Sequence, residues 1–381
     1  MTQGPEERTM NKVIVAPDSF KGTLSAGQAA DLIAAEVAAR YPNCTVVKLP
    51  LADGGEGSAE TIIAASGGRI MEAQVLSPDE RQITAGFGVT ASGQAVLEVA
   101  ASSGITQQAG LHPMTSSTFG FGQLILHALE LDLRDFFLCL GGSATTDAGC
   151  GMAAALGATF LDENGTSFIP CGATLQQVAR IDMSSLDQRV QGSNFTVMCD
   201  VENPLYGPCG AACVYGPQKG ANPTQVRALD RGLRHIAEVF LQMFGHDYAC
   251  VPGAGAAGGL GFGCQAFLNA RLESGIDAIL ELCDFKKHLE GADLIITGEG
   301  QLDDQSLSGK ALSGILRAAG NVPVISICGI CDAPTSLLRE HHLIVFETSK
   351  GISAKESMEH PEEHLSRTTA KALSPLMVSP F

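Results

Sequence analysis

The chain has 381 residues, of which 45% are hydrophobic, and a formal net charge of -17. This length and apolar content predict two or three folded domains and argue against a disordered chain. The acidic charge excludes nucleic acid and anionic membrane surfaces as expected partners, because both attract basic proteins.

The sequence also predicts a cytoplasmic protein. No apolar run approaches the roughly 20 residues that span a bilayer, and residues 1–10 contain no apolar signal-peptide core. The 12 cysteines are scattered, several of them inside apolar runs, without the paired spacings of a zinc site. We therefore expect reduced thiols and no membrane partner.

Two strand–loop–helix units open the chain. Apolar residues 12–16 and 45–49 are predicted strands, and each runs into a loop with acidic residues. Helices are predicted over residues 25–40, with Ser25 as the N-cap, and over 58–66. Successive units of this kind favour parallel strands with right-handed crossovers, so both acidic loops are expected at one sheet edge.

Antiparallel strands and a turn of small residues follow. Residues 83–89 and 94–99 alternate apolar and polar side chains, which predicts antiparallel strands. Residues 136–140 form a predicted strand that runs into the turn 141–151 and a helix at 152–156. This order of strand, small-residue turn and helix presents backbone N–H groups and a positive dipole end to phosphate.

A second strand of this type ends at Asp200. Apolar residues 195–199 deliver this carboxylate to the carboxyl edge of a sheet, which is where α/β proteins bind ligands. Asp200 is therefore placed like a general base, and Lys219, after a loop rich in Gly and Pro, like a partner for an anionic group. Taken alone, the segment also fits an Asp that caps a turn and a Lys in solvent.

Helices and a surface-like segment surround this strand. Residues 165–194 are polar, with one short predicted helix near Leu175, and further helices are predicted at 223–244 and 262–271. Between those two helices, Gly253-Ala-Gly-Ala-Ala-Gly258 matches the GxGxxG pattern of dinucleotide sites. Pro252 and the weak strand pattern before it disfavour that interpretation, because the pattern needs a strand, a tight turn and a helix.

Buried strands return near the end of the chain, at residues 292–297, 322–327 and 342–346. With the first two strands they make five, enough for a flavodoxin-like parallel sheet with helices on both faces. We therefore expect an α/β fold in which residues 1–67 and 291–381 form one domain and residues 68–290 a second, inserted α/β domain. The active site is expected in the cleft between the two domains.

Loops rich in Gly and acidic residues recur along the chain and favour phosphoryl transfer. Gly turns bring N–H groups to phosphates, carboxylates hold Mg²⁺, and lysines neutralise transferred charge. The loops contain Asp18 and Lys21, Asp53 and Glu56, Gly141 to Asp147, Asp200 and Lys219, Gly253 to Gly261, and Glu299 and Asp303. The residues alone leave open a nucleotide-independent enzyme, such as a sugar-acid dehydrogenase or isomerase, and a non-enzymatic interaction protein.

The same loops carry a family resemblance. The motifs are Ala16-Pro-Asp-Ser-Phe-Lys-Gly22, Ala52-Asp-Gly-Gly-Glu-Gly57, Gly141-Gly-Ser-Ala-Thr145, Cys199-Asp-Val-Glu-Asn-Pro-Leu205, Gly216-Pro-Gln-Lys-Gly-Ala221, Gly253-Ala-Gly-Ala-Ala-Gly-Gly259, and Thr297-Gly-Glu-Gly300 with Asp303, Gln305, Gly309 and Lys310. In this order they resemble the type I glycerate kinase family. The resemblance implies one flavodoxin-like and one inserted α/β domain, and transfer of the γ-phosphoryl of ATP to D-glycerate, typically giving 2-phosphoglycerate.

The resemblance and the local patterns together assign roles to residues. Asp200 is expected to accept the proton of the substrate hydroxyl, and Lys219 to act beside it. ATP is expected at Gly141, Gly142, Ser143, Ala144, Thr145, Gly255, Gly258 and Gly259, and the substrate at Asp18, Ser19, Lys21, Asp53, Glu56, Glu299 and Lys310. Mg²⁺ is expected at Asp53, Glu299 and Asp303, in a monomer or a homodimer.

Four residues depart from the family pattern. Thr146 stands where Asn is common, Ala148 where Gly is usual, and Gln123 where Glu is frequent. Gln123 is expected to lie at the surface, where the substitution has no functional effect. Gln301 stands where Arg is usual, and any contact of that Arg with phosphate or carboxylate would be weakened, since an amide carries no charge.

Overall fold

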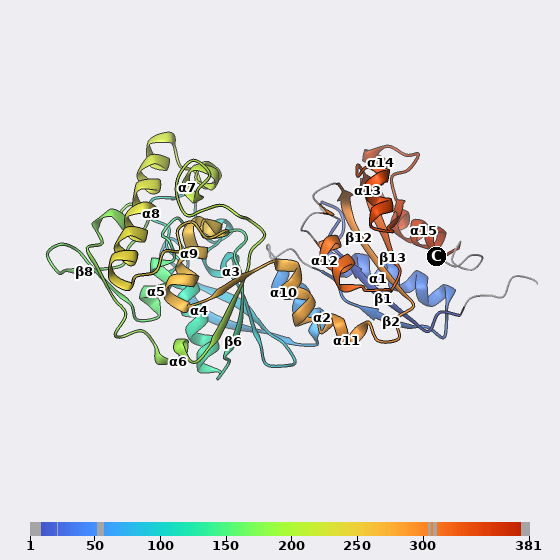
Figure 1. The fold of residues 1–381 in the computed structure, drawn as a ribbon, viewed down its shortest axis with the longest axis horizontal. Helices are drawn as coiled ribbons and strands as arrows, with labels where there is room; N and C mark the ends of the chain where they lie inside the picture. The colour runs from blue at the N-terminus through green and yellow to red at the C-terminus, as the bar shows by residue number, and fades with distance from the viewer. Residues whose placement is uncertain (1–8, 21, 52–56, 304–305, 308–310, 375–381) are drawn as a thin grey trace, which may run out of the picture. The chain divides into compact units, whose positions relative to one another are not determined.

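The computed structural model describes residues 9–20, 22–51, 57–303, 306–307 and 311–374 (Figure 1). The predicted site residues Lys21, Asp53, Glu56 and Lys310 lie outside this described part. The chain divides into two compact units, Met1–Asp53 with Ile279–Phe381, and Gly54–Ala278. The domain limits expected from the sequence, 1–67 with 291–381 and 68–290, stay a prediction.

A five-stranded parallel sheet forms the centre of the first unit. Its strands are β1 (Lys12–Pro17), β2 (Thr45–Lys48), β12 (Leu294–Leu302), β13 (Val324–Cys331) and β14 (Ile344–Glu347). They lie in the order β14-β13-β12-β1-β2, and every neighbouring pair is parallel. This is the flavodoxin-like strand order, so the fold predicted from the five buried apolar runs is confirmed.

Two long helices cover one face of this sheet (Figure 1). α1 (Ala26–Arg40) and α15 (Pro361–Leu373) pack against each other, and their apolar side chains share a core with β1, β12 and β13. Ser25 accepts a hydrogen bond from Gln28 N and begins α1 with a capping box, as the sequence predicted. The other helices of this unit are α11 (Phe285–His288), α12 (Ala311–Ala318), α13 (Thr335–Glu340) and α14 (Ala354–Glu359).

A six-stranded mixed sheet forms the centre of the second unit. Its strands are β3 (Arg69–Leu76), β4 (Gln82–Val89), β5 (Ala95–Glu98), β6 (Asp135–Cys139), β10 (Asn194–Met198) and β11 (Arg271–Glu273). In the order β11-β10-β6-β5-β4-β3, the first four strands are parallel to one another, β4 runs antiparallel to β5, and β3 runs antiparallel to β4. The predicted antiparallel pair at 83–89 and 94–99 is therefore confirmed.

Helices and a small sheet complete the second unit. The helices are α2 (Ser58–Ser66), α3 (Val99–Ser103), α4 (Phe119–Glu130), α5 (Cys150–Ala155), α6 (Gln188–Gln191), α7 (Ala211–Tyr215), α8 (Pro223–Phe244) and α9 (Ala256–Leu268), with short 3₁₀ turns η1 (Ile105–Gln107), η2 (Leu175–Gln177) and η3 (Pro217–Lys219). α10 (Gly275–Leu282) continues from this unit into the other. None of the helices described is both long and apolar enough to cross a bilayer.

The three-stranded sheet is the element that the sequence analysis missed. β7 (Thr159–Leu161), β8 (Ser167–Phe168) and β9 (Arg180–Asp182) pair antiparallel in the order β8-β7-β9, where only a surface-like segment with one short helix was expected. Each strand has only two or three residues. Alternation over so few positions is too short to stand out from a polar loop.

Candidate active site

Asp200 and the turn that begins at Gly141 lie at the carboxyl edge of the same sheet. β6 and β10 pair in parallel, with Met198 opposite Cys139. Asp200 comes two residues after the end of β10, and Gly141 two residues after the end of β6. Because neighbouring parallel strands end at one edge, the fold brings together two segments that are far apart in the sequence.

The start of a helix holds the Asp200 carboxylate. Asp200 is exposed, and its Oδ1 accepts hydrogen bonds from Gly275 N at 2.8 Å and from Ser274 Oγ at 3.4 Å. Gly275 is the first residue of α10, so the carboxylate lies at the positive end of that helix dipole. These contacts orient the side chain that the sequence analysis expects to act as the general base.

The turn after β6 is buried from Ser143 onward, and its side chains bond within the turn. Ser143 is 4% exposed, and Ala144 and Thr145 are fully buried. Ser143 Oγ lies 2.9 Å from Thr145 Oγ1 and accepts a hydrogen bond from Thr145 N at 3.1 Å. Ala144 N donates to Ser103 O at the end of α3. The two hydroxyls that were expected to face a phosphate therefore contact each other inside the protein.

Asp147 occupies the helix end that was expected to face phosphate. Its Oδ1 accepts from Gly149 N at 3.2 Å, and its Oδ2 accepts from Gly151 N at 3.3 Å and from both N and Oγ1 of Thr118 at 2.8 Å. Thr118 Oγ1 in turn accepts from Met152 N. The first N–H groups of α5 are thus satisfied within the chain. The expectation that this helix start presents them to a ligand is wrong, because a buried carboxylate has taken that place.

Lys219 is buried beside the same turn. It is 3% exposed, and its Nζ donates a hydrogen bond to Thr145 O at 2.6 Å. Burial lowers the pKa of Lys219 to about 8, and the nearby Asp147 carboxylate opposes that shift. Burial also raises the pKa of Asp147, against the hydrogen bonds from Thr118 and the two glycines. The solvated Lys that the sequence left open as an alternative is therefore excluded.

The second Gly-rich segment packs onto the first. Ala257, Gly258 and Gly259 have φ values of 52°, 70° and 91°, and Ala148 N donates to Gly258 O at 3.2 Å. A Cβ at Gly258 would lie 1.9 Å from Thr145 O, so only glycine permits this approach. Residues 246–251 form no strand, which removes the dinucleotide pattern from its required context.

In the first unit, the described acidic residues of the predicted site are Asp18, Glu299 and Asp303. Asp18 Oδ1 accepts from Ser19 N at 2.6 Å, and Asp18 N donates to Gly298 O across the β1–β12 edge. Glu299 and Asp303 share Ser306, whose Oγ lies 2.8 Å from Glu299 Oε2 and 3.3 Å from Asp303 Oδ1. Two carboxylates are thus held within reach of one hydroxyl at the end of β12.

The residues that depart from the family pattern have identifiable contacts. Gln301 Nε2 donates to Asp332 Oδ2 at 2.8 Å. Ala148 has a φ of 54°, a left-handed conformation that costs an alanine roughly 1–2 kcal/mol and a glycine almost nothing, which explains the usual glycine. Gln123 was expected at the surface, but its Oε1 accepts from Leu76 N at 2.7 Å and joins α4 to β3.

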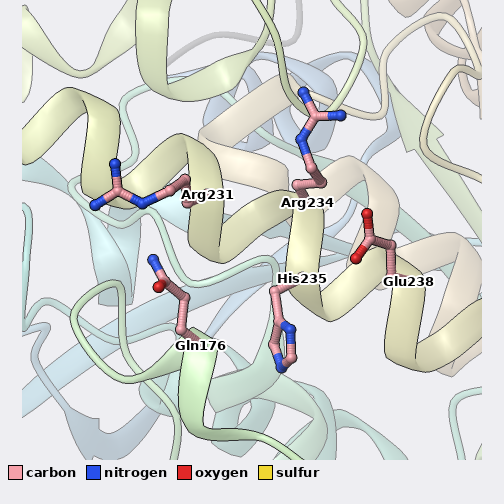
Figure 2. Close-up of a pocket in the computed structure, with 5 residues that line it drawn as sticks. All are labelled: Gln176, Arg231, Arg234, His235 and Glu238. Atoms are coloured by element: carbon pink, nitrogen blue, oxygen red, sulfur yellow. The ribbon is translucent and has the colours of Figure 1, made fainter.

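A surface pocket of about 290 Å³ lies elsewhere on the second unit (Figure 2). It is lined by Gln176 of η2 and by Arg231, Arg234, His235 and Glu238 of α8. None of the predicted site residues that the structure describes lines it. Across the described residues, no group of three or more His, Cys, Asp or Glu side chains could hold a metal ion.

Sequence reasoning missed several polar residues around the turn. Ser102, Ser103 and Thr118 are fully buried at its border, and Glu98 Oε1 accepts from Ala59 N at 2.6 Å in the first turn of α2. Glu98 lies inside the predicted strand 94–99, and the two serines follow it in a run of small residues, Ala100 to Gly104. The run of hydroxyls at 115–118 was the available signal, because buried hydroxyls need partners.

The chain matches the family model described as "Glycerate kinase family" over residues 13–377. It is 40% identical to the glycerate kinase of Bacillus subtilis (strain 168), over 94% of this chain and 95% of that one. It is 39% identical to the glycerate 2-kinase of Escherichia coli (strain K12), over 87% and 88%. A crystal structure from Salmonella typhimurium LT2, assigned as glycerate kinase 2, superposes with a TM-score of 0.85 at 35% identity and covers 97% of this chain and 98% of that chain.

The chain therefore belongs to the glycerate kinase family, as the motifs predicted. It shares its α/β architecture, which includes a five-stranded parallel sheet, with the Salmonella typhimurium structure. It is an enzyme of the ATP-dependent kinase class.

Because Lys219 is buried, we expect the unfolding free energy of the protein to depend on pH in the alkaline range. The pKa of Lys219 falls from 10.5 to about 8 on folding, so between these values the unfolded chain binds more protons than the folded one. The unfolding free energy should therefore rise with pH across this window, by up to about 1.4 kcal/mol per pH unit from this group. Relative to Lys219→Met, the wild type should gain about 2 kcal/mol between pH values of about 7.5 and 9.5 in urea titrations.

The matched control for this experiment is Lys48→Met, which removes a half-exposed lysine paired with Asp31. Its stability should run parallel to that of the wild type over the whole pH range. A constant difference between the wild type and Lys219→Met at both pH values would mean that Lys219 keeps an ordinary pKa.

Proposed function

We propose that the chain transfers the γ-phosphoryl of ATP to the 2-hydroxyl of D-glycerate, giving 2-phosphoglycerate, with Asp200 as the general base. One observation carries the assignment of the base. In a member of the glycerate kinase family, Asp200 lies at the carboxyl edge of a sheet beside the turn at Gly141. The position of the phosphate on the product follows the name of the Escherichia coli relative, a glycerate 2-kinase.

Asp200 would act on the substrate hydroxyl. Phosphoryl transfer needs little covalent chemistry from the protein, so positioning and electrostatics supply most of the catalysis. Gly275 N and Ser274 Oγ fix Asp200 Oδ1, which keeps the carboxylate in one orientation while it accepts the proton of the attacking hydroxyl. Lys219 would support the reaction through its hydrogen bond to Thr145 O, which lies in the turn after β6.

The two Gly-rich segments of the second unit would receive ATP. They contact each other directly, because Ala148 N donates to Gly258 O. The proposed ATP residues are Gly141, Gly142, Ser143, Ala144, Thr145, Gly255, Gly258 and Gly259. Since Asp147 and Thr118 already use the N–H groups at the start of α5, phosphate contacts would come from backbone ahead of Asp147.

Glu299 and Asp303 are the described residues that fit a Mg²⁺ ion. Their carboxylates approach one hydroxyl, that of Ser306, and Mg²⁺ prefers one or two carboxylates together with phosphate oxygens and water. When bound, the ion would neutralise charge on the transferring phosphoryl group. Asp18, Ser19 and Glu299, with Lys21, Asp53, Glu56 and Lys310, stay the proposed substrate residues, and Asp53 a further proposed metal ligand.

We further propose that the enzyme works in the cytoplasm, as a monomer or a homodimer. All 12 cysteines are free thiols, which is typical of a reducing compartment.

The reaction itself can be tested with the purified wild-type chain. Incubation with ATP, Mg²⁺ and D-glycerate should release ADP and give 2-phosphoglycerate, identified by phosphorus NMR. A dehydrogenase or isomerase in the same family fold would turn over D-glycerate without consuming ATP. Formation of 3-phosphoglycerate would overturn the proposed regiochemistry, and absence of ATP-dependent product would overturn the proposed activity.

Asp200→Asn tests the general base. The amide preserves the shape of the side chain but cannot accept the proton, so kcat should fall by about 10²- to 10⁴-fold while the fold is retained. Asp135→Asn is the matched control, because Asp135 begins the neighbouring strand β6 at the opposite edge and is exposed. Near-native kcat in Asp200→Asn would remove Asp200 from this role.

Glu299→Gln tests the proposed metal ligand. Loss of the carboxylate charge should raise the Mg²⁺ concentration for half-maximal activity by about tenfold or more. Glu340→Gln, an exposed substitution on α13 of the same unit, should leave this concentration unchanged. If Glu299→Gln has the Mg²⁺ dependence of the wild type, the metal is held elsewhere.

A further inference from the structure

Two oppositely charged side chains are buried at the turn 141–151 after β6. Lys219 and Asp147 are 3% and 0% exposed, and they belong to segments 72 residues apart. They meet at one place in the fold, because Lys219 Nζ donates to Thr145 O, two residues before Asp147. The Asp147 carboxylate also raises the pKa of Lys219 against the effect of burial. Since buried ionised groups are stabilised by nearby opposite charge and by hydrogen bonds, we expect each charge to stabilise the other.

The hydrogen bonds show which chemical form of Asp147 the fold holds. All four contacts to its oxygens come from donors: the N–H groups of Thr118, Gly149 and Gly151, and the Thr118 hydroxyl. An ionised carboxylate accepts from all of these donors, whereas a protonated one would need an acceptor for its own O–H, and these four contacts supply none. The arrangement therefore suits a negative charge, which needs a nearby cation.

Lys219 also contacts the turn directly. Its Nζ donates to the carbonyl oxygen of Thr145, two residues before Asp147. Ala144 N donates to Ser103 O on one side, and Ala148 N to Gly258 O on the other. The lysine is thus the contact that fixes the middle of the turn, between backbone contacts to α3 and α9.

We propose that Lys219 and Asp147 are positioning residues that lock the 141–151 turn in its reactive shape, and that Lys219 does not touch the transferred phosphoryl group. This rests on the proposed function, since the turn is the proposed ATP contact. The ammonium is directed at a backbone carbonyl and is closed off from solvent. It acts on the reaction through the backbone it holds and through the charge it balances.

A double-mutant cycle of Lys219→Met, Asp147→Asn and the combined variant tests the proposal. Each single variant should lower kcat and raise KM for ATP, with a loss in kcat/KM of about tenfold or more, and leave KM for D-glycerate within about twofold. Each single change leaves one buried charge without its partner, but the combined variant leaves none. Its loss should therefore be at least about threefold smaller than the product of the two single losses.

The alternatives give different results in the same cycle. If Lys219 contacts the phosphoryl group, the loss in kcat/KM of the combined variant should equal the product of the two single losses. Asp147→Asn would then not offset the loss caused by Lys219→Met. If the pair serves the fold alone, Lys219→Met unfolds at lower urea concentration but keeps wild-type kcat and KM. Either result overturns the proposal. If Lys219→Met is insoluble, the combined variant decides, because restored solubility and activity support the charge pair and continued insolubility contradicts it.

Two measurements keep this test separate from the proposed function. The wild type and Lys48→Met run in the same assay, and Lys48→Met removes an exposed lysine from the first unit and should match the wild type. If the wild type shows no ATP-dependent phosphorylation of D-glycerate, the proposed function is wrong. If the wild type is active and the losses in kcat/KM of the two single variants multiply in the combined variant, only the positioning role is wrong.

Discussion

The parallel pairing of β6 with β10 is the constraint on which the candidate site depends. It places the ends of two strands, and therefore the 141–151 turn and Asp200, at one edge of one sheet. Both faces of β10 are buried from Phe195 to Met198, and Phe195 stacks on its partner in the register, Phe136, with ring centroids 4.6 Å apart. A one-residue slip would exchange the two faces of the strand and separate these rings. The apolar core thus fixes the register, and the register fixes which polar groups meet.

Around that edge the protein buries several polar and charged side chains. Asp147, Lys219, Thr118 and the serines near the turn are all almost inaccessible. Burying such groups costs several kcal/mol unless they are paired and hydrogen-bonded. Here the donors at the start of α5 satisfy Asp147, and Thr145 O accepts from Lys219. The result is a turn in which Gly142 is exposed while the side chains of residues 143–147 are held in the interior.

Sequence patterns predicted the parts of this structure that follow from periodicity. The five apolar runs of the first unit predicted its strands, and Ser25 predicted a helix start, because both signals are local. The short strands β7 to β9 escaped, since two or three residues carry no detectable alternation. Long-range polar contacts escaped as well. No local pattern shows that Asp147 would meet Thr118, or that Lys219 would be buried.

The sequence predicted individual segments of the candidate site, but it predicted only some of the contacts between them. Asp200 at a strand end could be read from the apolar run before it, and the structure places it beside the turn at Gly141. The start of α5 was expected to bind phosphate. In the folded chain, however, the Asp147 carboxylate of the same turn accepts hydrogen bonds from Gly149 N and Gly151 N. The close approach at Gly258 likewise depends on a backbone 113 residues earlier in the chain, at Thr145.

Hydrogen–deuterium exchange of the wild type, with and without ADP, Mg²⁺ and D-glycerate together, tests the central claim most directly. If the turn and the β10 edge form one ligand site, peptides covering residues 141–147 and 198–203 should both gain protection when the ligands are added. Protection confined to other parts of the chain, with both of these segments unchanged, would contradict the account.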